Sequence, residues 1–195
     1  MSAKVHQAVL DHDLDTLARQ LAAGEDPNEL RDYAPLHNAI GDLEAVALLL
    51  RFGADPNIWD GARYVTPLLT AMLCKEPESA LMLLAAGADP NVRSSEGDMP
   101  LALCAKEGDL KMAAMLLRSG AAKTIDASTG FEWMTALGHA AYRLDIAMIR
   151  LLLAWGASIS ALDADHNYAW ERLPERTEEN AEKYDLALEL LSPKS

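Results

Sequence analysis

Five histidines and two cysteines are the residues of this sequence whose side chains most often act as bases, nucleophiles or metal ligands. The two cysteines, Cys74 and Cys104, are too few for a thiolate metal cluster or a disulfide scaffold. No second histidine, cysteine or carboxylate lies at metal-ligand spacing beside His139, and His12 and His166 fall in predicted turns. The sequence therefore predicts no catalytic residue, no metal site and no cofactor.

The sequence motifs of common enzyme classes are also missing. It contains no Gly-x-Ser-x-Gly nucleophile elbow, no phosphate-binding Gly-x-x-x-x-Gly-Lys loop and no His-Glu-x-x-His zinc motif. The acids at Asp11, Asp13 and Asp15 are too few for a calcium loop, so we interpret them as a solvated turn. We predict a protein that is not an enzyme. The alternative is an active site formed by loops that no motif describes.

The net charge of −13, from 17 basic and 30 acidic side chains, is concentrated at the two ends of the chain. Residues 1–60 carry 11 acidic and 4 basic side chains, and residues 163–195 carry 9 and 4. Such a chain repels the phosphates of nucleic acids, so we exclude nucleic-acid binding and expect a basic protein partner. The alternative is that the acidic side chains serve only solubility.

The hydrophobic residues are not arranged as in a membrane or secreted protein. No apolar run approaches the roughly 20 residues that a membrane-spanning helix needs. The first residues lack the basic region, apolar stretch and cleavage site of a signal peptide. We therefore expect a cytoplasmic protein that does not bind membranes and is a monomer when free.

One short phrase recurs along the chain at a spacing near 33 residues. It reads GADPN at 53–57 and 87–91 and GEDPN at 24–28, and weaker forms begin at Gly120 and Gly156. Glycine ends helices because it adopts a left-handed conformation without steric cost. The phrase therefore predicts five helix ends, each followed by a turn. The apolar anchors of the five helices, at i, i+3 and i+7, begin at Leu14, Leu43, Pro77, Leu110 and Ile146.

A second phrase precedes four of these helices, as APLHNAI (34–40), TPLLTAM (66–72), MPLALCA (99–105) and TALGHAA (135–141). Threonine caps helices, and proline is tolerated in a first helical turn. The phrase therefore predicts a short helix before each longer one. Small residues inside it let neighbouring helices approach closely, at Ala39, Ala71, Cys104 and Ala140.

Together the two phrases resemble the ankyrin-repeat pattern, most closely in APLHNAIGDLEAVALLLRFGADPN at 34–57. The resemblance implies an all-α fold, a solenoid of about six helix pairs joined by protruding β-turn fingers. It also implies that His6 and His37 tie neighbouring turns together. We predict a single ankyrin-repeat domain over residues 1–195, with repeats at about 1–30, 31–59, 60–92, 93–125 and 126–162 and a capping repeat at 163–195.

Two departures from the pattern carry information about individual repeats. The first repeat has Gln20 where the others have a leucine, which fits a terminal repeat with one solvated side. The second repeat is four residues short, and its first helix is expected to end before Gly41.

The resemblance implies that partners are contacted through the finger tips and the exposed side of the first helix of each pair. Tryptophan, tyrosine and arginine are enriched among the residues that dominate protein interfaces. The candidate partner-binding residues are Trp59, Arg63, Tyr64, Arg93, Glu96, Phe131, Trp133, His139, Tyr142, Arg143 and Tyr168. The alternative for Trp59 and Trp133 is that each folds back and braces a neighbouring finger.

These observations favour a non-catalytic module that binds a folded protein through a concave face and finger loops. A small acidic binding protein could act as an inhibitor, such as an immunity protein that neutralises a basic toxin or enzyme. The alternative is an adaptor or host-directed effector that recruits its partner instead of blocking it. An adaptor would hold two partners at once, whereas an inhibitor would hold one.

Overall fold

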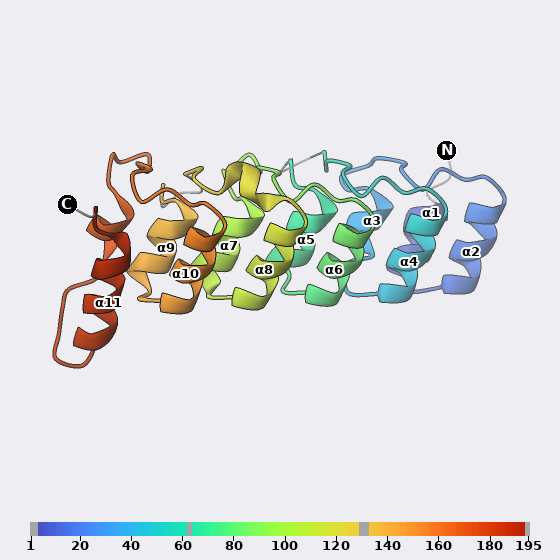
Figure 1. Ribbon diagram of the computed structural model, residues 1–195. Coiled ribbons are helices and arrows are strands. Elements are labelled where there is room, and N and C mark those ends of the chain that lie inside the picture. Colours follow the sequence, from blue (N-terminus) through green and yellow to red (C-terminus); the bar gives the residue numbers. More distant parts are fainter. Residues whose placement is uncertain (1–3, 62–63, 129–132, 194–195) are drawn as a thin grey trace. The chain divides into compact units, whose positions relative to one another are not determined.

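Short helices joined by tight turns and longer loops make up the structure, a computed structural model that describes residues 4–61, 64–128 and 133–193 (Figure 1). All regular secondary structure in these ranges is helical, as the all-α prediction requires. The chain divides into two compact units, residues 1–95 and 96–195.

The first unit contains three helix pairs. They are α1 (Lys4–Leu10) with α2 (Leu14–Ala22), α3 (Pro35–Asn38) with α4 (Leu43–Arg51), and α5 (Pro67–Leu73) with α6 (Pro77–Ala85). The first helices of the pairs pack in one row, α1 on α3 and α3 on α5, and the second helices pack in another, α2 on α4 and α4 on α6. Helix α3 has only four residues, which confirms the expected early end before Gly41.

The second unit contains two further pairs and a shorter closing segment. The pairs are α7 (Pro100–Glu107) with α8 (Leu110–Arg118) and α9 (Ala136–Tyr142) with α10 (Ile146–Ala154), and a short 3-10 helix, η1 (Ala121–Thr124), follows α8. The closing segment consists of the 3-10 helix η2 (Ala169–Arg172) and helix α11 (Ala181–Leu191). Within this unit α7 packs on α9 and α8 on α10, while η2 covers α9 and α11 covers α10.

The helices begin and end at the residues that the two recurring sequence phrases predict. The five phrase glycines, from Gly24 to Gly156, all have positive φ, between +86° and +101°. The side chains of Thr66 and Thr135 accept hydrogen bonds from the backbone N–H of Leu69 and Gly138 at the starts of α5 and α9. The predicted glycine helix ends and threonine caps are therefore confirmed.

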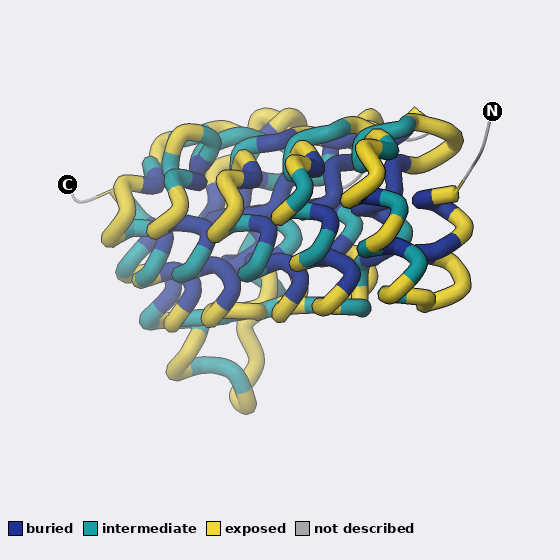
Figure 2. Tube along the Cα trace, turned by 90° about the vertical axis from the view of Figure 1, so that its right-hand side faces the viewer, coloured by how far each residue is buried: buried dark blue, intermediate teal, exposed yellow. Residues whose placement is uncertain are grey.

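The core lies where helices of neighbouring pairs face one another, and the turns are exposed (Figure 2). The small residues Ala39, Ala71, Cys104 and Ala140 are all buried, as expected for close helix contacts. The predicted anchors are partly wrong, because Leu43 and Leu110, at the first position of their helices, are exposed. The buried positions of the second helices instead include Leu49, Leu83, Leu116 and Leu152.

Side-chain amides join consecutive repeats of the first unit at the turn after each second helix. The Asn28 amide donates to the carbonyl of Gly53 at 3.2 Å and accepts from the N–H of Asp55 at 2.8 Å. One repeat later the Asn57 amide makes the same pair of bonds, to Gly87 at 3.1 Å and from Asp89 at 2.7 Å. Each turn is therefore held by the one before it.

Two histidines fix the loops of the first unit to its helices. The Nε2 atom of His6 lies 2.7 Å from the carbonyl oxygen of Tyr33, and that of His37 lies 2.9 Å from the carbonyl oxygen of Val65. Both rings are buried, and burial lowers the pKa of His37 although the bond to Val65 acts in the opposite direction. The implied role of both histidines in tying turns together is confirmed.

The helices of the described ranges are short, and none of them is long and apolar enough to cross a lipid bilayer.

Candidate protein-binding surfaces

Two loops of the first unit touch at their tips and form what we call the first finger pair, residues 29–33 and 58–65, of which 62–63 lie outside the described ranges. The backbone N–H of Gly61 donates to the carbonyl of Asp32 at 3.2 Å. A Cβ atom added at Gly61 would lie 3.2 Å from the carbonyl oxygen of Arg31, tighter than an ordinary contact. Glycine is therefore needed for the two loops to approach this closely.

The second loop of this pair is also closed at its base. The N–H of Asp60 donates to the carbonyl of Val65, and the buried carboxylate of Asp60 accepts from the N–H of Val65, both at 3.0 Å. The same Val65 carbonyl is bound by His37. The base of the loop, at Asp60 and Val65, is thereby fixed to the body of the unit.

Large apolar side chains lie exposed on the first finger pair. Trp59 is 40% exposed and Tyr64 is 62% exposed, and Leu30 and Tyr33 on the neighbouring loop are exposed as well. Among the described residues no aromatic ring stacks on Trp59 or Tyr64. A patch of this kind on a rigid support is typical of protein interfaces.

The second unit has a comparable arrangement, which we call the second finger pair, residues 126–134 and 163–168, of which 129–132 are outside the described ranges. The N–H of Ala164 donates to the carbonyl of Trp133 at 3.1 Å and joins the two loops. Trp133 is 51% exposed. Tyr168 is partly exposed and stacks on Trp170, with ring centroids 6.4 Å apart and planes inclined by 15°.

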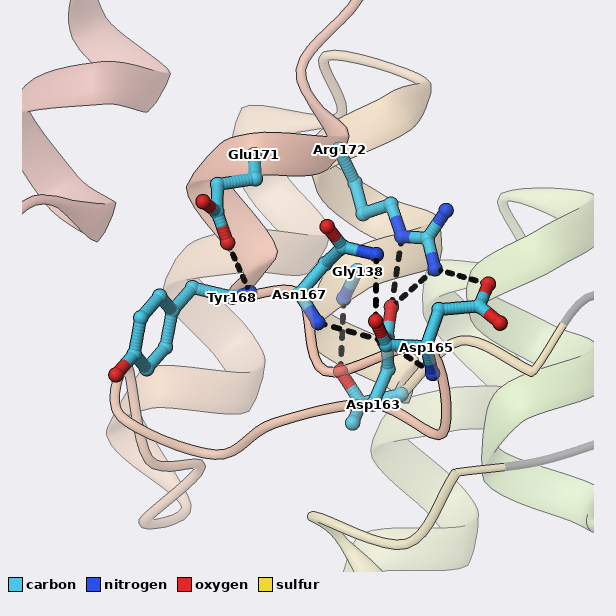
Figure 3. A network of polar contacts seen from close by, with 8 residues as sticks. Gly138, Asp163, Asp165, Asn167, Tyr168, Glu171 and Arg172 are labelled. Atoms are coloured by element: carbon cyan, nitrogen blue, oxygen red, sulfur yellow. Dashed lines mark hydrogen bonds and ion pairs between the residues drawn. The ribbon is translucent and has the colours of Figure 1, made fainter.

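A polar network holds the base of the second finger pair (Figure 3). Arg172 donates from Nε and Nη2 to one carboxylate oxygen of the buried Asp163, at 2.7 and 2.6 Å, and from Nη2 to Asp165 at 2.8 Å. The other Asp163 oxygen accepts the N–H groups of Asp165 and Asn167. The side chain of Arg172 passes over Gly138, where a Cβ atom would lie 3.7 Å from its Cγ.

The aromatic residues with the largest exposure in each finger pair share an unusual backbone conformation. Tyr64 has φ = +52° and Trp133 has φ = +58°, and each stands two residues before the threonine that caps the next helix. The corresponding residue before α7 is Gly97, with φ = +86°. His166, before η2, also has positive φ. A bulky residue in this left-handed region costs about 1–3 kcal/mol, and glycine would avoid that cost.

The sequence-based placement of His139 on an exposed helix side is wrong. Its side chain is only 5% exposed, in a helix against which both α7 and η2 pack. His139 is therefore withdrawn as a partner contact. Its neighbours on the same turn, Tyr142 and Arg143, are exposed as expected.

The remaining candidates differ in how far the structure describes them. Arg93 and Glu96 are exposed in the loop between α6 and α7. The guanidinium group of Arg143 lies against the backbone of Gly108, where a Cβ atom would be 2.7 Å from Nη2. Arg63 and Phe131 lie outside the described residues.

The described residues form no metal-ligand cluster, and one of the two free cysteines is buried. Within them, no three histidine, cysteine or acidic side chains are grouped so that they could hold a metal ion. Burial raises the pKa of the Cys104 thiol, which keeps it protonated, while Cys74 is exposed. Asp13 caps α2 by accepting the N–H of Thr16 at 2.9 Å, which accounts for one of the three closely spaced N-terminal acids.

The arrangement of capped helix pairs, glycine turns and fingers can be compared with known families. The family model described as "Ankyrin repeats (3 copies)" matches residues 5–94 and 80–163. The chain belongs to the ankyrin-repeat family. Ankyrin repeats are protein–protein interaction modules, and the finger pairs described above carry exposed aromatic side chains.

Several curated proteins are similar to parts of this ankyrin-repeat chain. The nuclear factor NF-kappa-B p105 subunit of Gallus gallus is 35% identical over 99 residues, covering 50% of this chain and 10% of that protein. The human NF-kappa-B inhibitor alpha is 31% identical over 99 residues, covering 49% of this chain and 31% of the relative. Protein PhlB of Serratia liquefaciens is 38% identical over 103 residues, covering 51% and 45%. This chain thus spans less than half the length of each of these relatives.

Proposed function

We propose that this ankyrin-repeat chain is a non-catalytic module that binds a folded protein through its two finger pairs. The observation that carries the proposal is the exposure of Trp59, Tyr64 and Trp133 on loops that hydrogen bonds hold in place. Rigid aromatic side chains lose little conformational entropy on binding, and they supply large contact areas. A standard interface of about 1,600 Å² would extend from the fingers onto the first helices.

The opposing interpretation, in which the tryptophans brace neighbouring fingers, is less well supported by the contacts. The bonds that join the loops run through backbone groups, from Gly61 to Asp32 and from Ala164 to Trp133. Neither indole ring stacks on another ring in the described ranges. Removal of these side chains should therefore leave the fingers closed.

We further propose that the module acts as an inhibitor of a basic protein, such as a toxin or enzyme that it neutralises. The charge of −13 supports a basic partner, because opposite charges speed association and favour correct orientation. One similar protein is named an inhibitor, the NF-kappa-B inhibitor alpha. This likeness supports inhibition as a mode of action and leaves the partner of this chain to be found by experiment.

Capture of a partner from cells of the native source tests the proposal. The double variant Trp59→Ala/Trp133→Ala should lose at least tenfold in captured partner, because such residues often dominate binding energy. The matched control is Trp155→Ala, which removes a tryptophan of similar exposure that lies outside the fingers, at the end of α10. Circular dichroism of all variants should be unchanged.

The same experiment includes outcomes that would contradict the proposal. Equal loss of capture in the Trp155→Ala control would place the interface elsewhere, and loss of folding in the double variant would support bracing. Capture should also weaken between 50 mM and 500 mM salt, because screening shortens the range of charge interactions. An affinity that does not change with salt would reject a basic partner.

A further inference from the structure

Tyr64 and Trp133, the two aromatic finger residues with a left-handed backbone conformation, allow a more specific contact to be inferred. We propose that Tyr64 and Trp133 each receive a lysine or arginine side chain of the partner against the face of the aromatic ring. This inference rests on the proposed function, since it names the chemistry by which the fingers recognise a protein. Three features of the two residues support this contact: their backbone conformation, their exposure and the acidic character of the chain.

The backbone conformation at these two positions is one that glycine adopts more easily than an aromatic residue. Gly97 occupies the same position before α7 with positive φ, so the loop forms there without any side chain. Tyr64 and Trp133 take up this position despite the steric cost to residues with a Cβ atom. Both remain more than half exposed, so a large part of each ring is open to a partner. Positive φ also occurs at the exposed turn residue Lys75, so it is the combination of this conformation with an exposed aromatic ring that points to binding.

The charges near the two rings favour a cation as the bound group. In the first finger pair, Gly61 is bonded to Asp32 of the neighbouring loop, which is exposed. In the second, Trp133 is bonded to Ala164, next to Asp165, whose half-exposed carboxylate also accepts a hydrogen bond from Arg172. The face of an aromatic ring attracts lysine and arginine side chains, and nearby carboxylates strengthen this attraction.

A nuclear magnetic resonance titration tests this chemistry without knowledge of the partner. The ¹⁵N-labelled chain is titrated with acetyl-tetraarginine amide, and the control probe is acetyl-tetracitrulline amide, which has nearly the same shape but no charge. We expect saturable shifts of the Tyr64 and Trp133 backbone amides and of the Trp133 indole N–H with the arginine probe. The citrulline probe should cause no comparable shifts.

Variants separate ring binding from general attraction to an acidic protein. Tyr64→Gly and Trp133→Gly keep the net charge, so each should abolish the shifts around its own finger, while Tyr64→Phe should retain them. Shifts confined to the acidic segments 11–15 and 175–182 would overturn the inference. Equal shifts with the citrulline probe, or shifts that persist in the glycine variants, would also overturn it.

The unfolding temperature gives a second readout. Relief of backbone strain raises it in a glycine variant, whereas loss of a ring that stabilises the fold would lower it. Glycine relieves the left-handed strain and alanine does not, so Tyr64→Gly should unfold about 2–4 °C above Tyr64→Ala. A Tyr64→Gly variant that unfolds below both the alanine variant and the wild type would show that the ring stabilises the fold. That result would overturn the inference.

The two proposals can fail separately. If the probe binds at the fingers but partner capture does not depend on the tryptophans, the proposed function is rejected and the cation contact is retained. Tryptophan-dependent capture without probe shifts at Tyr64 or Trp133 would retain the binding module and reject the cation contact.

Discussion

Replacement of Arg172 by alanine should lower the free energy of unfolding by about 3 kcal/mol. The reason is the carboxylate of Asp163, whose side chain is only 3% exposed and which would lose its counter-ion. Two backbone N–H groups would still bind this carboxylate, but they do not neutralise it. For a chain of this size the loss corresponds to a melting temperature lower by roughly 6–12 °C, measurable by circular dichroism.

The second unit also offers a matched control for this prediction. Arg176 makes a two-bond pair with Asp185, at 2.8 Å for both bonds, but both side chains are more than half exposed. Exposed pairs of this kind contribute little because water and salt screen them. Arg176→Ala should therefore leave the unfolding transition unchanged within error. Equal losses in the two variants would show that the Asp163 charge is hydrated and that its burial has no energetic consequence.

Truncation of Leu83 to alanine is expected to cost about 3 kcal/mol in the free energy of unfolding. Leu83 is fully buried in α6, a helix that packs on α4 and α5, and the cavity left by alanine cannot be filled by water. The measurement is the midpoint of urea unfolding. Leu73→Ala is the control, because Leu73 is about half exposed at the end of α5, and its removal should cost less than about 1 kcal/mol.

At the position of the first repeat that corresponds to Leu83, a substitution should instead raise the free energy of unfolding. The first repeat carries Gln20 there, and its side-chain oxygen is buried without a hydrogen-bond partner among the described residues. Gln20→Leu should raise the free energy of unfolding by about 1 kcal/mol. A loss of stability in Gln20→Leu would instead show that the amide is bound to water, and it would weaken the assignment of Gln20 to the leucine register.

Much of the fold could be predicted from the sequence because its determinants are local. A glycine at a helix end, a threonine at a helix start and a histidine in the PLH phrase each act within a few residues or on the next repeat. Gly53, Thr66 and His37 illustrate the three cases, and the structure bears each of them out. The exposed Leu43 and Leu110 were mispredicted because the first turn of a helix extends beyond the packed interface.

The candidate surfaces were only partly predictable. Exposure of Trp59, Tyr64 and Trp133 follows from their place in loops, but burial of His139 depends on how neighbouring elements such as α7 and η2 pack on α9. The left-handed conformation of Tyr64 and Trp133 was missed, although a signal was present. Alignment on Thr66, Met99 and Thr135 places both aromatic residues at the position of Gly97.

The hydrogen bonds of Asn28 and Asn57 have a consequence for how such a chain can change in length. Each amide contacts only backbone groups of the following turn, so the joint does not depend on which side chains that turn carries. A duplicated or deleted block of one period would present the same carbonyl and N–H groups to the preceding asparagine. The same pair of hydrogen bonds can therefore form between different repeats. Duplication or deletion of a repeat could change the length of the protein without requiring a new type of contact.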